Sequence, residues 1–144
     1  MKRTYVLMIV LLLCLNILTS PAAALGTLER IDFDDGSYAI ITTEIVSQTR
    51  TEISDSKTYT YYNASGQRCF AYTLYATFTY NGSTSSADEC YYLADIYHRG
   101  WDISTHREYT SGSTAYGSAT FTGPDGQTRP VYLSLTCSRN GNVT

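Results

Sequence analysis

The 144-residue sequence contains few charged side chains and few basic ones. Charged residues make up 16% of it, against roughly 25% in an average globular protein, and only 10 residues are lysine or arginine. Proteins that bind nucleic acids need a basic surface, so this composition argues against a nucleic-acid partner. The length also excludes a TIM barrel, or a Rossmann enzyme with a separate substrate domain.

Helical periodicity is lacking as well. No segment of helical length repeats apolar residues with a period of 3.6, so we expect almost no helix. The sequence is instead rich in tyrosine, with 14 copies, and in threonine. Both residue types favour the half-buried surfaces of pleated sheets. The composition therefore predicts a small all-β protein.

The first 24 residues have the features of a secretory signal peptide. Two basic residues follow the initial methionine, and an unbroken apolar run occupies residues 6–15. This run is shorter than the roughly 18 to 20 residues that span a membrane, and small residues at 22–24 supply a cleavage pattern. Leucines rather than small residues precede Cys14, which argues against a lipoprotein. We therefore expect residues 1–24 to be removed, and residues 25–144 to form one secreted domain without a stable membrane anchor.

Short alternating segments between turn residues indicate about eight antiparallel strands. The expected strands are residues 28–33, 38–46, 57–62, 70–80, 90–97, 101–109, 115–121 and 131–137. In the clearest of them, 70–80, large apolar residues alternate with small or polar ones, as on a strand with one buried face. Residues 47–56 lack glycine and proline and fit either a long loop or a weak edge strand. Strands with such short connections predict a two-layer β-sandwich, with a small closed barrel as the alternative.

Segments 90–97 and 101–109 are expected to pair as a hairpin. A loop of two or four residues places Tyr97 opposite Asp102, and the apolar members of both strands then share one face. In this register the outward face carries the candidate binding residues Tyr91, Leu93, Asp95, Tyr97 and His106.

Tyrosines on such a face can bind a partner or simply cover the sheet. The side chain has a flat apolar ring with a hydrogen-bonding tip, which suits sugars or protein surfaces. Tyr59, Tyr61 and Tyr75 are further candidates for exposed positions. The alternative is that the tyrosines cover the second face of a twisted sheet or the rim of the sandwich.

Three cysteines follow residue 24, so one intramolecular disulfide is possible. Alternation places Cys90 and Cys137 on the apolar sides of their strands and Cys69 on the wetter side of its own. We therefore predict a Cys90–Cys137 disulfide, which export permits and which would stabilise the fold by roughly 4 kcal/mol through loop closure. Cys69 is then a partly buried free thiol, or forms a bridge to another molecule.

Residues with catalytic or metal-binding chemistry are sparse. Asp102, Ser104 and His106 alternate along one strand and outline a hydrolase triad, but no Gly-x-Ser-x-Gly turn presents the serine. A His-x-His or Cys-x-x-Cys pair for a metal is missing, and the aspartate turns at 34–36 and 123–126 lack the other ligands of a calcium loop. We expect no enzyme activity, no metal and no cofactor.

Strand and turn motifs cover most of the chain after residue 24. They are KTYTYYNASG (57–66), ATFTYNGST (76–84), SGS (111–113) and LTCS (135–138), together with Cys90 and Trp101. These motifs resemble a group of small exported proteins from Gram-positive, clostridial-type, often gut-dwelling bacteria. The resemblance implies a secreted β domain and supports Cys90 and Cys137 as partners. Cys69 departs from the group's pattern, which has a large apolar residue there, and the resemblance implies no activity.

Export, an outward aromatic face and the sparse catalytic residues together predict a function. We expect a non-enzymatic β-sandwich that binds a glycan or a protein at or outside the cell surface. A secreted antagonistic factor, such as a bacteriocin-like protein or toxin, is the alternative that the small exported chain allows. A hydrolase built on Asp102, Ser104 and His106 is the third hypothesis.

Overall fold

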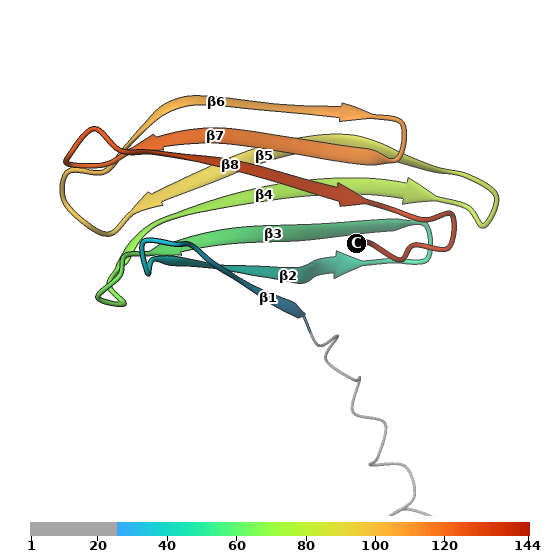
Figure 1. Cartoon of the computed structure of the whole chain (residues 1–144). Helices are drawn as coiled ribbons and strands as arrows, with labels where there is room; N and C mark the ends of the chain where they lie inside the picture. The colour runs from blue at the N-terminus through green and yellow to red at the C-terminus, as the bar shows by residue number, and fades with distance from the viewer. Residues whose placement is uncertain (1–25) are drawn as a thin grey trace, which may run out of the picture.

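The computed structural model describes residues 26–144, which form eight antiparallel strands in two sheets (Figure 1). The strands are β1 (Thr27–Asp32), β2 (Tyr38–Gln48), β3 (Glu52–Tyr62), β4 (Arg68–Tyr80), β5 (Ser85–Ile96), β6 (Asp102–Ser111), β7 (Thr114–Thr122) and β8 (Thr128–Thr136). Within these residues there is no helix and no closed barrel, so the all-β prediction is confirmed and the barrel alternative is wrong. The predicted targeting segment, residues 1–24, lies outside the described residues.

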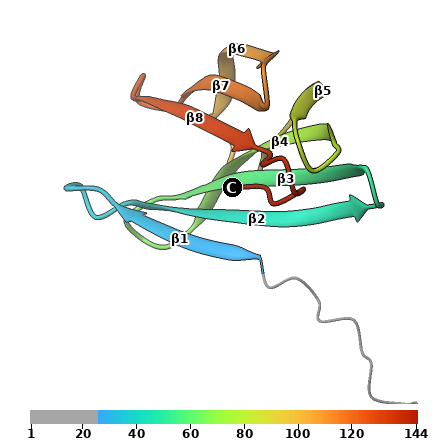
Figure 2. The ribbon, with the colours of Figure 1, turned by 90° about the vertical axis from the view of Figure 1, so that its right-hand side faces the viewer.

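Each sheet is built from strands that are consecutive along the chain. Strands β1 to β5 form a five-stranded sheet, and β6 to β8 form a three-stranded sheet that lies over part of it (Figure 2). The expected hairpin between residues 90–97 and 101–109 is therefore wrong. Strand β5 pairs with β4 and β6 pairs with β7, so the connection after β5 carries the chain from one sheet to the other.

A buried tryptophan explains why β5 and β6 do not form a hairpin. The backbone N–H groups of Tyr97 and His98 both donate to the carbonyl oxygen of Cys69, at 2.9 and 3.0 Å, and hold the start of the connection against β4. Trp101 then turns inward, and its ring centroid lies 5.0 Å from that of Phe70. Burial of a large apolar side chain contributes at least about 1.5–3 kcal/mol. The chain therefore passes from β5 into the second sheet, with the Trp101 side chain in the core.

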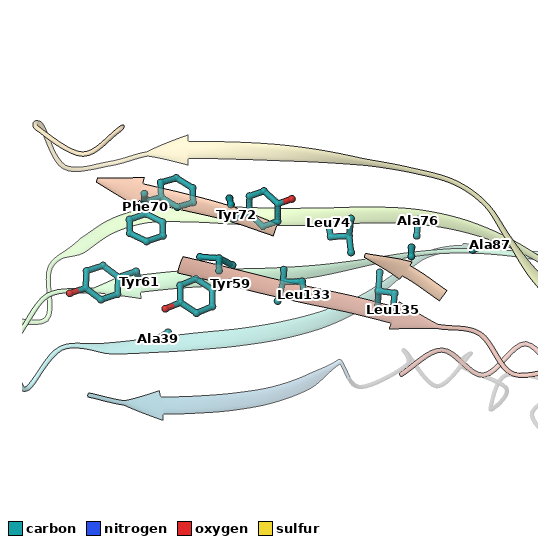
Figure 3. Packing of buried hydrophobic residues seen from close by; sticks show 14 of the residues in the cluster. Ala39, Tyr59, Tyr61, Phe70, Tyr72, Leu74, Ala76, Ala87, Leu133 and Leu135 are labelled. Atoms are coloured by element: carbon teal, nitrogen blue, oxygen red, sulfur yellow. The ribbon is translucent and has the colours of Figure 1, made fainter. Parts of the chain in front are cut away.

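The two sheets enclose an aromatic core (Figure 3). Phe70 on β4 stacks on Phe121 of β7 with ring centroids 3.9 Å apart, which joins the sheets. Tyr61 on β3 lies against the same Phe70 ring, 5.2 Å away. Tyr59 and Tyr61 are buried, so the expectation that they are exposed is wrong. Both lie directly opposite core residues of β4, namely Tyr72 and Phe70, and share their inward direction.

The turns follow local hydrogen-bonding chemistry. The expected turns at 34–36 and 123–126 are confirmed as backbone turns. Residues 47–56 form the end of β2, a tight turn and the start of β3, which is an inner strand and not an edge strand. The turn forms without glycine or proline. The Thr49 hydroxyl stabilises it by accepting a hydrogen bond from the backbone N–H of Glu52 at 3.0 Å.

The three cysteines of residues 26–144 are free thiols, so the predicted Cys90–Cys137 disulfide is not formed. The two thiols lie near different carboxylates: Glu108 raises the pKa of Cys90 and Asp55 raises that of Cys137, in each case adding to the larger effect of burial. The Cys137 thiol is 1% exposed and donates to the carbonyl oxygen of Ser138 at 3.3 Å, whereas Cys90 is only half-buried.

Cys69 is buried, with 1% of its surface exposed, and does not lie on a wet face. The ladder between β3 and β4 shifts by one residue between Tyr61 and Tyr62, which leaves Cys69 without a partner position. The alternation of inward and outward side chains along the rest of β4 therefore does not predict the direction of the Cys69 side chain. Burial raises the pKa of its thiol.

The outer edge of β8 is covered by contacts from other parts of the chain. At one end, Arg129 donates to a carboxylate oxygen of Asp35. In the middle, the Lys57 ammonium donates to the Ser134 carbonyl oxygen at 3.1 Å. At the other end, the backbone of Thr144 exchanges two hydrogen bonds with Thr136 of β8.

Candidate binding surface

The outward face of the five-stranded sheet carries most of the residues that the sequence singled out. Tyr91 and Leu93 on β5 are 55% and 52% exposed. Asp95 is exposed one step further along the same strand, and Tyr97 is exposed just beyond its end. The structure therefore brings Tyr91, Leu93 and Asp95 together in the predicted alternating row.

His106 does not belong to this face. The ladder between β6 and β7 shifts between Ile103 and Thr105, and this bulge turns His106 toward the space between the sheets. Its ring lies 4.3 Å from that of Tyr92, a residue on the inner side of β5. Its Nδ1 atom lies 3.3 Å from a carboxylate oxygen of Glu108. The prediction that His106 accompanies Tyr91 is wrong because β6 belongs to the other sheet, and the extra residue of the bulge then turns His106 inward rather than outward on that sheet.

The same bulge separates the members of the suggested hydrolase triad. The Ser104 hydroxyl donates to the carbonyl oxygen of Thr120 at 2.9 Å. The Asp102 carboxylate accepts a hydrogen bond from the backbone N–H of Ile103 at 2.8 Å. Since His106 is paired with Glu108, the three side chains have separate partners and no serine–histidine–aspartate relay joins them in the described residues.

Tyr91 is supported by a second tyrosine on the neighbouring strand. Tyr75 of β4 lies directly opposite it, with ring centroids 4.8 Å apart and ring planes within 9° of parallel. Leu93 lies in the next row, opposite Thr73, whose hydroxyl is 2.9 Å from that of Thr58 on β3. The surface thus consists of a tyrosine pair and an aliphatic side chain, whereas Thr73 next to them is buried.

A row of arginine and tyrosine side chains crosses the same face near the end of β5. Its members, from β1 across to the residue after β5, are Arg30, Tyr38, Tyr62, Arg68 and Tyr97. Arg30 lies 3.9 Å above the Tyr38 ring, and Tyr38 stacks on Tyr62 at 4.8 Å. Arg68 lies 3.5 Å above the Tyr97 ring. One face of Tyr97 is therefore covered by Arg68, as one face of Tyr91 is by Tyr75. Tyr91 and Leu93 keep the larger exposed fractions, 55% and 52% against 46% for Tyr97.

The outward face of the three-stranded sheet has aromatic residues that sequence reasoning missed. Tyr109 of β6 stacks on Tyr116 of β7 at 4.9 Å, and Arg107 lies 4.9 Å above the Tyr109 ring. Tyr132 on β8 is 78% exposed. The sequence does contain a signal for Tyr132: it alternates with Val131, Leu133 and Leu135, which form the inward side of the strand, so it is expected to point outward.

A cavity of about 320 Å³ lies between the β1–β2 side of the large sheet and the C-terminal segment. Asp55 of β3 lines it and is 3% exposed. One of its oxygens accepts a hydrogen bond from the Ser56 backbone N–H at 2.7 Å. Burial nevertheless raises the pKa of this carboxyl group to about 6, with Glu44 raising it further and Lys57 lowering it.

Residues 26–144 contain neither a cluster of metal-ligating side chains nor a membrane-spanning helix. No group of three or more histidine, cysteine, aspartate and glutamate side chains there is arranged to hold a metal ion. None of these residues forms a helix that is long and apolar enough to cross a membrane.

Comparison with known proteins adds no relative. No family model matches the chain, and no match was found among curated proteins or solved structures.

Proposed function

We propose that the protein is an exported, non-catalytic binding module that holds an extracellular glycan or protein on the outward face of β4 and β5. The observation that carries this proposal is the stacked pair Tyr75–Tyr91 with half-exposed Leu93 in the next row. Apolar side chains that lie next to one another on the surface, rimmed by polar residues, are typical of interaction sites.

Two properties of the surface support binding. Tyr91 is held by its stack on Tyr75, so little side-chain freedom is lost when a partner covers it. A tyrosine side chain carries a hydroxyl at the tip of its apolar ring, which lets the exposed Tyr91 supply both contact area and a hydrogen bond. A sugar would stack on the tyrosine rings, whereas a protein partner would also bury Leu93.

The test measures retention of the protein on immobilised cell-wall polysaccharide and on mucus. Tyr91→Ala should lower retention at least about tenfold, the factor that 1.4 kcal/mol represents. Leu93→Ala should share this loss for a protein partner and show a smaller one for a glycan. Tyr132→Ala, on the other sheet, is the matched control because it removes a more exposed tyrosine.

The control variant should be retained like the unchanged protein. Circular dichroism and a thermal melt establish that each variant is folded. Retention of folded Tyr91→Ala at the level of the unchanged protein would overturn the proposed surface, as would an equal loss in Tyr132→Ala.

A further inference from the structure

Pairs of stacked tyrosines lie on the outward faces of both sheets, and the members of each pair are directly opposite on neighbouring strands. The pairs are Tyr38–Tyr62, Tyr75–Tyr91 and Tyr109–Tyr116. Their ring centroids are 4.8, 4.8 and 4.9 Å apart, and their ring planes lie within 8°, 9° and 16° of parallel. All six side chains are at least partly exposed. Reagents in solution can therefore reach these rings.

The other tyrosines of residues 26–144 lack this combination of exposure and pairing. Tyr61 and Tyr72 are buried in the core, where a reagent in solution does not reach them. Tyr132 is 78% exposed, but no aromatic ring of residues 26–144 stacks on it. The paired arrangement thus distinguishes a defined subset of the tyrosines.

We propose that these three pairs are sites of oxidative coupling, in which each pair becomes an intramolecular dityrosine crosslink. The co-reactant is hydrogen peroxide used by a peroxidase-type one-electron oxidant. The inference does not depend on the proposed binding function. It rests on the positions of the rings and on the chemistry of phenols.

Coupling is a two-electron oxidation of the tyrosine pair by hydrogen peroxide. Each of the two phenols in a pair loses one electron and one proton and becomes a phenoxyl radical. The radicals combine through ring carbons next to the oxygens, and the two displaced ring hydrogens move to the oxygens, which restores both phenols. The pair loses two hydrogen atoms in total, and one hydrogen peroxide takes up the two electrons and two protons to give two waters.

Geometry favours coupling within a pair over coupling between molecules. Directly opposite residues of an antiparallel ladder have Cβ atoms about 4.5–5.5 Å apart, so the partner ring of Tyr75 or Tyr109 is already in place. A reaction between groups held in this way corresponds to a very high effective concentration. A lone ring such as Tyr132 must instead meet another molecule by diffusion.

The crosslinks would connect neighbouring strands covalently without any cysteine. The crosslinks would join β2 to β3, β4 to β5 and β6 to β7, so that both sheets are tied. A crosslink that closes a loop restricts the unfolded chain, as a disulfide does, and the longer loops closed by 38–62 and 75–91 contribute more than that closed by 109–116. The oxidised protein should therefore unfold at a higher temperature than the untreated protein.

The experiment treats the purified protein at low concentration with a peroxidase and hydrogen peroxide. Denaturing electrophoresis then separates monomers, and mass spectrometry of proteolytic fragments locates crosslinked pairs by the loss of two hydrogen atoms. The expected result is a fluorescent monomer with crosslinks 38–62, 75–91 and 109–116. Each crosslink tests one pair.

Phenylalanine variants are the matched controls, because they keep the ring and remove the oxidisable hydroxyl. Tyr91→Phe should abolish the crosslink to Tyr75 and leave the other two, and Tyr116→Phe should do the same for Tyr109. Tyr132→Phe should leave all three intact. The proposal is overturned by a monomer without dityrosine, by crosslinks mainly at Tyr132 or between molecules, or by a 75–91 pattern unaffected in Tyr91→Phe.

Discussion

The hydroxyl group of Tyr72 on β4 lies directly against Gly117 on β7, so close that a Cβ atom at position 117 would be 2.8 Å from the hydroxyl oxygen. A Cβ there would also lie 3.0 Å from the Cδ1 atom of Leu74. Real Cβ atoms essentially never lie under 3.0 Å from another heavy atom, and at 3.0 Å the Leu74 side chain would have to shift. The missing side chain at position 117 therefore sets how closely the two sheets approach at this point.

Gly117→Ala should destabilise the protein by about 1–3 kcal/mol, the usual cost of adding a methyl group to a filled core. A denaturant titration measures the change. The double variant Tyr72→Phe/Gly117→Ala should recover part of the loss, because the nearest atom has been removed. Full stability of Gly117→Ala would show that the sheets can move apart at no cost.

Tyr72→Phe alone should leave stability unchanged or raise it by about 1 kcal/mol. The Tyr72 hydroxyl is buried without a hydrogen-bond partner among residues 26–144, and such a group is unfavourable. Tyr61→Phe is the matched control, since the Tyr61 hydroxyl accepts a hydrogen bond from Arg129 at 3.2 Å. It should cost about 0.5–1.5 kcal/mol. A larger loss in Tyr72→Phe than in Tyr61→Phe would contradict this assignment.

The buried carboxyl group of Asp55 should make stability depend on pH. Its pKa is raised from 3.8 to about 6 in the folded protein, so the folded state holds the proton more tightly than the unfolded state. The contribution of this group is therefore greatest below pH 4, falls as the pH rises to about 6, and is constant above that.

Asp55→Asn isolates this contribution, because other carboxylates titrate in both proteins. The variant should exceed the unchanged protein in stability by about 1–2 kcal/mol at pH 7, a value reduced for water in the adjoining cavity. The difference should vanish near pH 4. Unfolding curves at several pH values measure it, and a difference that grows toward low pH would contradict the assignment.

The cysteines of residues 26–144 should all react as thiols once the protein is unfolded. Denaturation with an alkylating reagent and no reductant should add three labels to this part of the chain. Labelling of the native protein should be slow, because burial raises the pKa of Cys69, Cys90 and Cys137 and lowers the thiolate fraction. Detection of a peptide pair joined through Cys90 and Cys137 would contradict this and support the disulfide predicted from alternation.

Local patterns were sufficient to predict most strands and turns. The alternation in 70–80 and the turn residues at 34–36 and 123–126 act through neighbouring positions, which a sequence displays directly. The exposed row of Tyr91 and Leu93 was predictable for the same reason.

The errors arose where one residue interrupts a ladder or where distant segments compete. The bulge at Ser104 moves His106 to the inner face, and a similar shift next to Cys69 buries that thiol. Both depend on how the neighbouring strand pairs. The inward turn of Trp101 depends on Phe70, a residue far away in the chain. The assignment of strands to two sheets could not be deduced from local patterns alone.

The contacts along the outer edge of β8 have a consequence for association between molecules. An open strand edge is a template on which another chain can add a strand and begin a fibre. Here the side chain of Lys57 already occupies the Ser134 carbonyl, and the backbone of Thr144 already pairs with Thr136. An incoming strand would have to displace both, so this edge resists the growth of the small sheet into an aggregate.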